Sequence, residues 1–135
     1  LVFIDNNNFK SINDQHGHLV GDEVLKEMAN RLKSNIRQQD FVARLGGDEF
    51  AIILNSVNTI ENLSAIAENL LKCCEHPLIY KDQEIHFSFS LGIALSSQAA
   101  NPEDFISQAD QAMYKAKSLK QHWSIFDSEP FRTSL

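Results

Sequence analysis

The stretch FVARLGGDEFAIIL, residues 41–54, contains two apolar runs that flank Gly46-Gly47-Asp48-Glu49. Short apolar runs on either side of a glycine pair predict two strands joined by a tight turn. A turn needs glycine, but it does not need two neighbouring carboxylates. A cation-binding turn would explain the acids, whereas a plain solvated turn is the commoner origin of so short a motif.

The composition of the 135-residue chain is that of one ordinary globular domain, with 43% hydrophobic and 22% charged residues. The net charge of −6 argues against a nucleic-acid-binding protein, although a divalent cation could still bring a nucleotide to an acidic surface. No apolar run reaches the roughly 18 residues of a membrane span, so we expect no membrane contact. The adjacent cysteines Cys73 and Cys74 are poorly placed for a disulfide, which is typical of a reducing cytoplasm.

Hydrophobic periodicity predicts an α+β domain in which helices pack on one antiparallel sheet. Residues 6–23 are expected to form a polar loop, and residues 128–135 a linker after a domain that spans residues 1–127. Asn101 and Pro102 are expected to begin the last helix. The predicted strands are 1–5, 41–45, 50–54, 77–80, 84–95 and 123–127, and the predicted helices are 21–36, 59–75 and 101–119.

Three carboxylates are expected to meet at one edge of this sheet. Asp5 ends the first strand, and Asp48 and Glu49 lie at the hairpin turn. If the first strand lies beside the hairpin, these like charges raise one another's pKa unless a cation is present. Mg²⁺ prefers a few carboxylates together with substrate phosphates, so the pattern favours a magnesium site.

The polar segment 6–23 carries a second set of candidates. Backbone N–H groups near its glycines, together with Lys10, could hold a phosphate chain. Asp22 could be a helix N-cap, or its carboxylate could accept from N1–H and N2–H of guanine, with Asn13 on another part of the same edge. His16 and His18 favour zinc only weakly, because the surrounding donors are oxygens.

Two cationic groups have both an ordinary and a functional interpretation. Arg37 and Asp40 could form a solvated ion pair, or a small site for phosphate or guanine. Lys117, in the last predicted helix, could be a solvated helix-terminal charge or could face the phosphates.

Taken in order, four motifs resemble the GGDEF domain, the diguanylate cyclase family of bacterial signalling. The motifs are FIDNNNFKSINDQHGHLVGDEVL (3–25), RQQDFVARLGGDEFAIIL (37–54), FSFSLGIAL (87–95) and ADQAMYKAK (109–117). The resemblance implies a palm-like, ferredoxin-like fold. It also implies condensation of two GTP into cyclic di-GMP with release of pyrophosphate, in a homodimer in which each domain holds one GTP.

The resemblance also implies roles for individual residues. Asp5, Asp48 and the backbone carbonyl of Asn6 would hold Mg²⁺ or Mn²⁺, with two ions per site. Asp48 and Glu49 would be the catalytic residues, and Glu49 would bind the second ion or help to deprotonate the attacking 3′-hydroxyl. Asn13 and Asp22 would read guanine, Asn8, Phe9, Lys10, Gly46, Gly47 and Lys117 would meet the phosphates, and Arg37 and Asp40 would form a product-binding inhibitory site.

The chain departs from the family pattern at two positions. Asn7 stands where the family usually has an acid, and Gln121 stands where it has an arginine, with Lys120 one position earlier. The family's amino-terminal helix is missing, and the tail IFDSEPF resembles a junction to an EAL phosphodiesterase domain. The resemblance as a whole implies a bacterial cytoplasmic cyclase. The alternative is a weak or inactive module that binds GTP or cyclic di-GMP and regulates a fused sensory or EAL domain.

Overall fold

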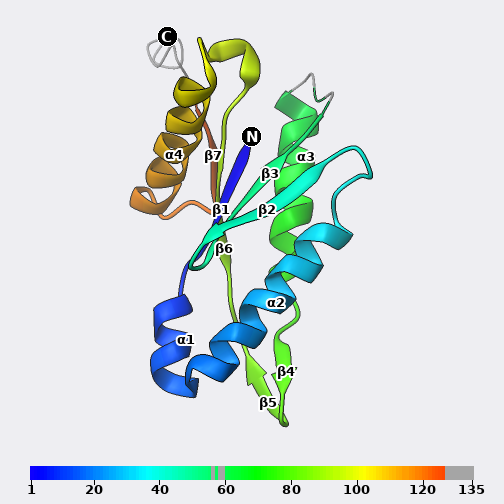
Figure 1. Cartoon of the computed structure of the whole chain (residues 1–135), viewed down its shortest axis with the longest axis vertical. Coiled ribbons are helices and arrows are strands. Elements are labelled where there is room, and N and C mark those ends of the chain that lie inside the picture. Colours follow the sequence, from blue (N-terminus) through cyan, green and yellow to red (C-terminus); the bar gives the residue numbers. More distant parts are fainter. Residues whose placement is uncertain (56, 58–59, 127–135) are drawn as a thin grey trace.

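The computed structural model describes residues 1–55, 57 and 60–126 (Figure 1). The predicted boundary at residue 127 and the predicted linker 128–135 lie outside these ranges. The elements are β1 (Val2–Asn6), α1 (Phe9–His16), α2 (His18–Ser34), β2 (Phe41–Gly46), β3 (Glu49–Ile53), α3 (Ile60–Leu71), a 3₁₀ turn (Lys72–Cys74), β4 (Leu78–Tyr80), β5 (Gln83–Ile85), β6 (Phe89–Ile93), a 3₁₀ turn (Ser96–Gln98), α4 (Pro102–Ser118) and β7 (Trp123–Ile125).

The central sheet has the strand order β2-β3-β1-β6-β7, and a separate hairpin is formed by β4 and β5. The β1–β3, β1–β6 and β2–β3 pairs are antiparallel, as predicted, so the α+β architecture is confirmed. The prediction of a wholly antiparallel sheet is wrong for β7, which pairs in parallel with β6. The reason is that α4 is a crossover connection, which returns the chain beside β6 in the same direction.

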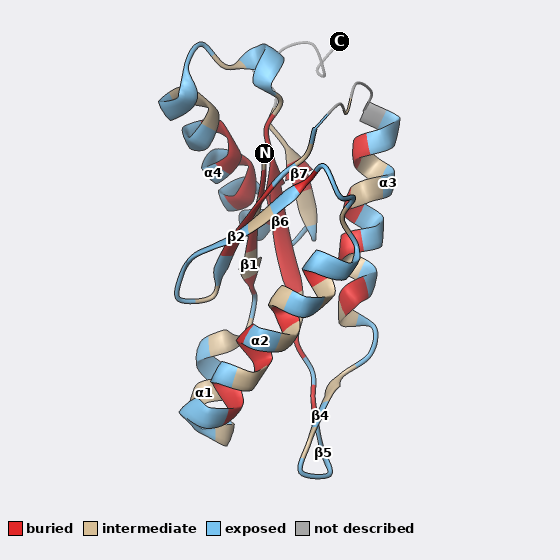
Figure 2. Ribbon diagram, turned by 45° about the vertical axis from the view of Figure 1, so that its right-hand side comes forward, coloured by how far each residue is buried: buried red, intermediate tan, exposed pale blue. Residues whose placement is uncertain are grey.

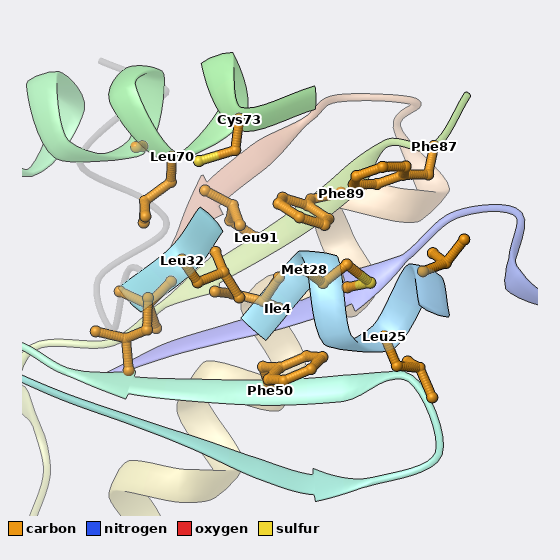
Figure 3. Close-up of a cluster of buried hydrophobic side chains, with 14 of the residues drawn as sticks. Ile4, Leu25, Met28, Leu32, Phe50, Leu70, Cys73, Phe87, Phe89 and Leu91 are labelled. Carbon is orange, nitrogen blue, oxygen red and sulfur yellow. The ribbon is translucent and has the colours of Figure 1, made fainter. Parts of the chain in front are cut away.

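Helices cover the sheet from both sides. Figure 3 shows Met28 and Leu32 of α2 and Leu70 of α3 packed against side chains of β1, β3 and β6, and all these side chains belong to one buried cluster. On the opposite face α4 packs so closely on β6 that a Cβ at Gly92 would lie 2.3 Å from the backbone nitrogen of Met113. Figure 2 shows the burial concentrated in β1 and β6 and on the inward sides of the helices. Every helix within the described ranges is too short or too polar to span a lipid bilayer.

The predicted loop 6–23 is wrong, because it contains α1 and the first residues of α2. Ile12 and Val20 are buried, and together with the apolar face of α2 they hold this otherwise polar segment in two helices. Gly17 joins the helices with φ +91°, a conformation that favours glycine. Asp22 therefore lies inside α2 and is not its N-cap, so the capping explanation for this residue is also wrong.

The predicted strand 84–95 is interrupted because its two ends pair with different partners. Residues 83–85 pair with β4, whereas residues 89–93 pair with β1. Between them, the Asn7 N–H donates to Ser88 O over 2.9 Å, which ties the crossing segment to the end of β1. The predicted start of the last helix is confirmed, because the Asp104 N–H donates to Asn101 Oδ1 over 2.8 Å and Pro102 is the first helical residue.

Candidate functional site

The end of β1 lies against the β2–β3 hairpin, as the strand-terminal acids predicted. Asp5 is directly opposite Glu49 in the β1–β3 ladder. Gly46 and Gly47 form the turn with φ +149° and +51°, and a Cβ on either would meet nothing within 4 Å. The glycines are thus favoured by backbone conformation rather than by crowding. Arg44, which the sequence analysis missed, braces this turn by donating from Nε to Gly47 O over 3.0 Å.

Asp5 and Asp48 form a pair of interacting carboxylates. The pKa of Asp48 is raised to about 6, first because the group is partly removed from water and then because Asp5 lies beside it. Asp5 Oδ1 is buried and accepts no hydrogen bond. Two neighbouring carboxylates, one with an unsatisfied buried oxygen, are the arrangement that a cation stabilises.

Lys117 supplies one positive charge to this pair. It extends from the last turn of α4, and its ammonium forms an ion pair with Asp5 Oδ2. A lysine predicted either to face the phosphates or to be a solvated charge thus lies against the acidic pair.

The donor set fits a divalent ion that keeps open coordination positions. Within the described residues no group of three or more His, Cys, Asp or Glu side chains is arranged to hold a metal. The three carboxylates do meet at one edge of the sheet, because Asp5 lies opposite Glu49 and beside Asp48. Glu49 is exposed, however, so the interacting pair is formed by Asp5 and Asp48. Mg²⁺ commonly uses one or two carboxylates with water and phosphate oxygens, so the pair still fits that ion. The Asn6 side chain is buried and accepts a hydrogen bond from the Asn8 N–H. Only the backbone of Asn6 is therefore left to bind a metal ion.

An open groove of about 830 Å³ runs from the acidic pair to the start of α1. No side chain caps α1, and the Asn8 N–H is already bonded to Asn6 Oδ1 over 2.8 Å. Three backbone groups were predicted to meet phosphate. Two of them, the N–H groups of Phe9 and Lys10 in the first turn, make no hydrogen bond within the described residues. The groove is lined by Asp5, Asn6, Asn7, Asn8, Phe9, Lys10, Ser11, Asp14, Gln15, Asp48 and Lys117.

The two predicted guanine-reading residues lie on adjacent helices. Asp22 is exposed on α2 and lines a cleft of about 480 Å³ between α2 and the β2–β3 hairpin, together with Leu25, Arg44 and other residues. Asn13 is on α1 and packs against Gly21, the residue before Asp22. Its Oδ1 is buried without a hydrogen-bond partner.

Asn7 is held by two serines that the sequence analysis did not single out. Its Nδ2 donates to Ser88 Oγ over 2.9 Å, and its Oδ1 accepts from Ser90 Oγ over 2.5 Å. A neighbouring pocket of about 330 Å³ is lined by Asn7, Ser90, Lys117, Lys120, Gln121 and His122. Lys120 has φ +55°, so it stands at a left-handed position after α4 where glycine is favoured.

Arg37 and Asp40 lie at the opposite end of the β2–β3 hairpin from the acidic pair. Asp40 is buried, and it accepts from Arg37 Nε and Nη2 and from the backbone N–H of Arg37 and Asn55, all within 2.9–3.0 Å. The hydrogen bonds from Arg37 lower the pKa of Asp40, and Asp40 raises the pKa of Arg37. The simple prediction of a solvated ion pair is thus wrong for Asp40. A cavity of about 440 Å³ adjoins the pair, between the segment that follows α2 and helix α3.

The chain is similar to known signalling proteins over most of its length. A family model described as "Diguanylate cyclase, GGDEF domain" matches residues 1–122. Diguanylate cyclase TpbB of Pseudomonas aeruginosa is 40% identical over 87% of this chain and 27% of its own length. The bifunctional diguanylate cyclase/cyclic di-GMP phosphodiesterase MucR of the same species is 38% identical over 87% of this chain and 17% of its own. The chain thus spans about a quarter or less of the length of these relatives.

Solved structures give the same result. A truncated TpbB comprising only the GGDEF domain has a TM-score of 0.89 at 36% identity, covering 98% of this chain and 78% of that chain. The active GGEEF domain of a Vibrio cholerae diguanylate cyclase has a TM-score of 0.79 at 34% identity, covering 94% and 81%. An EAL/GGDEF domain protein from M. capsulatus has a TM-score of 0.85 at 40% identity, covering 93% and 83%. With the family model matched over residues 1–122 and the fold shared with these domains, the chain belongs to the GGDEF domain family of diguanylate cyclases.

Proposed function

We propose that this domain condenses two molecules of GTP into cyclic di-GMP with release of two pyrophosphates. The observation that carries the proposal is the Asp5–Asp48 pair beside Lys117, at the head of a groove that leads to the first turn of α1. In each of two steps a 3′-hydroxyl oxygen forms a bond to an α-phosphorus, the bond to pyrophosphate breaks, and the hydroxyl proton leaves to a base. Glu49, exposed beside Asp5, is the candidate to assist that proton's departure.

Asp5, Asp48 and the backbone carbonyl of Asn6 would hold two Mg²⁺ or Mn²⁺ ions. When bound, divalent ions stabilise the attacking and leaving oxygens of such a displacement. The residues of the chain supply the negative charge that gathers the ions, and Lys117 offsets part of that charge near the phosphates.

The remaining groove residues would bind and orient GTP. The N–H groups of Phe9 and Lys10 lie at a helix N-terminus, which attracts phosphate, and the turn at Gly46 and Gly47 has no side chain to obstruct its approach. Asn13 and Asp22 would recognise the base. One domain would hold one GTP, so catalysis would need a second copy of the domain facing the first.

Arg37 and Asp40 would bind the product at a separate inhibitory site. The guanidinium is exposed beside a cavity of about 440 Å³, and a guanidinium can bind phosphate or guanine through two hydrogen bonds. Arg37 has to exchange part of its bonding with Asp40 for the ligand, while two backbone N–H groups keep Asp40 satisfied.

A second function is favoured by the two departures from the family pattern. Both ends of the Asn7 amide are engaged by serines, so it brings no negative charge to the groove. Gln121 cannot grip a terminal phosphate as arginine would. A domain weakened in this way would bind GTP or cyclic di-GMP and regulate a fused domain, and relatives such as MucR and the EAL/GGDEF protein carry two such activities or domains.

The deciding experiment incubates the full-length protein with GTP and Mg²⁺ and separates the products by chromatography. Cyclic di-GMP that disappears in Asp48→Ala and Glu49→Ala supports the cyclase. GTP binding without product overturns it in favour of the regulatory module. Gln121→Arg then tests the cause, because restored product formation would identify the missing phosphate contact.

A further inference from the structure

Gly21 is a buried glycine in the interior of α2 whose missing side chain makes room for Asn13. A Cβ at position 21 would lie 1.8 Å from Asn13 Oδ1 and 2.9 Å from Asn13 Cγ. The next atom, Phe9 Cζ, is 3.4 Å away, which is ordinary contact. The present position of the Asn13 side chain is therefore compatible only with glycine at position 21.

The fold itself does not require this glycine. Gly21 is not among the glycines with positive φ, and glycine weakens a helix interior relative to alanine. The atoms that a Cβ would meet belong to the end of a side chain that can rotate away, and backbone atoms outside the helix are not among them. An alanine would thus displace Asn13 and leave the helices packed.

The placement of Asn13 also brings no hydrogen bond to the fold. Asn13 Oδ1 is buried without a partner, and its Nδ2 makes no hydrogen bond within the described part of the chain. A buried polar atom without a partner is unfavourable, so the fold gains no stability from this placement of the amide. With its oxygen turned against Gly21, the amide has its N–H groups left for that ligand.

We propose that Gly21 is a positioning residue, which lets the Asn13 amide lie against α2 at the residue before Asp22 and thereby sets the preference for guanine. The inference rests on the proposed function. If the Asp22 carboxylate accepts from guanine N1–H and N2–H, the next group on that edge is O6, an acceptor suited to Asn13 Nδ2. Adenine presents an amino donor there, which an amide N–H repels.

The test measures binding of 3′-deoxy-GTP and 3′-deoxy-ATP with Mg²⁺ by calorimetry, because analogues without the attacking hydroxyl cannot condense. The full-length protein is compared with Gly21→Ala, Asn13→Ala and the double variant. Loss of one base contact should lower the guanine preference roughly tenfold in Gly21→Ala. The double variant should match Asn13→Ala in guanine preference, since the glycine acts only through that side chain. It should melt at a higher temperature than Asn13→Ala, because alanine favours the helix over glycine.

Gly17→Ala is the matched control, because a Cβ there meets nothing within 4 Å but φ is +91°. It should lose stability and keep the preference, the reverse of Gly21→Ala. The inference alone would be overturned if Gly21→Ala kept its full guanine preference or failed to fold. It would also be overturned if the double variant lost more guanine preference than Asn13→Ala, or if Gly17→Ala lost that preference. Equal binding of both analogues by the unmodified protein would overturn the proposed base recognition and the inference with it.

Discussion

Lys117, at the end of α4, donates to Asp5 at the end of β1, across 112 residues of sequence. Asp5 also lies beside Asp48, so one ammonium faces two carboxylates. This contact joins the helix on one face of the sheet to the strand that leads into the groove (Figure 1). A divalent ion bound to the same carboxylates would meet Lys117 as a neighbouring positive charge. Metal binding and the Lys117–Asp5 pair are therefore expected to be coupled.

Lys117→Met removes this charge and keeps most of the aliphatic side chain. In metal-free buffer we expect unfolding to become easier by about 0.5–1 kcal/mol, because Asp5 loses its counter-ion. In the presence of Mg²⁺ the variant should gain more stability than the unmodified protein, because the competing cation is gone. Thermal melts across a magnesium titration measure both effects. Lys115→Met, in the same helical turn but without a contact to Asp5, should show neither, and equal magnesium responses in all three proteins would contradict the coupling.

Asp48 should make the protein less stable as pH rises through weakly acidic values. Its pKa is about 6 in the folded state against an ordinary value of 3.8, so the folded protein binds more protons in this window than the unfolded chain. Stability from this group is present in full below about pH 4 and is lost as pH rises through 6. Asp48→Asn should therefore melt higher than the unmodified protein at pH 7.5 without metal, with the difference vanishing near pH 3.5. A constant difference across this range would show that Asp48 titrates normally.

The parts of the site that could be predicted from the sequence are those fixed by neighbours in the chain. Asp5 follows an apolar strand and Asp48 follows a glycine turn, so antiparallel pairing of those strands was enough to bring the two carboxylates together. Arg44 and Ser90 were missed, because an arginine in a strand and a serine in an alternating strand have many ordinary roles. Their contacts with Gly47 and Asn7 depend on register and long-range packing.

The errors in the fold have the same origin. Helix α1 was predicted as loop, because Phe9 and Ile12 are the only large apolar residues among its eight and give no clear period. The parallel direction of β7 was missed, although a helix predicted between two strands is the connection that parallel strands need. Its direction is set by α4, which crosses the sheet from β6.

Asp40 should contribute more to stability than an exposed acid does. Asp40→Ala removes the acceptor of the Arg37 and Asn55 backbone N–H groups, so we expect a loss of about 2–3 kcal/mol in the free energy of unfolding at pH 7. The pKa of Asp40 is lowered in the fold, so this contribution exists above its ordinary value of 3.8 and is lost as pH falls through the lowered pKa. Urea unfolding at pH 7 and pH 3 measures it. Asp110→Ala, an exposed acid on α4, is the control, and equal losses in the two variants would contradict the buried role.

Gly92→Ala makes the same chemical change as Gly21→Ala, at a glycine whose surroundings are backbone. The new Cβ would lie 2.3 Å from Met113 N and 2.4 Å from Ala109 O, so α4 as a whole has to move away from β6. We expect a loss of about 2–3 kcal/mol in the free energy of unfolding, as for other overpacked cores. Because Lys117 follows Met113 by about one helical turn, the shift should also weaken its contact with Asp5 and alter the magnesium response of the melting temperature. Gly21→Ala, whose Cβ meets a movable side chain, should keep both its stability and its magnesium response. If Gly92→Ala and Gly21→Ala lost similar amounts of stability, the cost of the added Cβ would not depend on whether it meets backbone or a side chain.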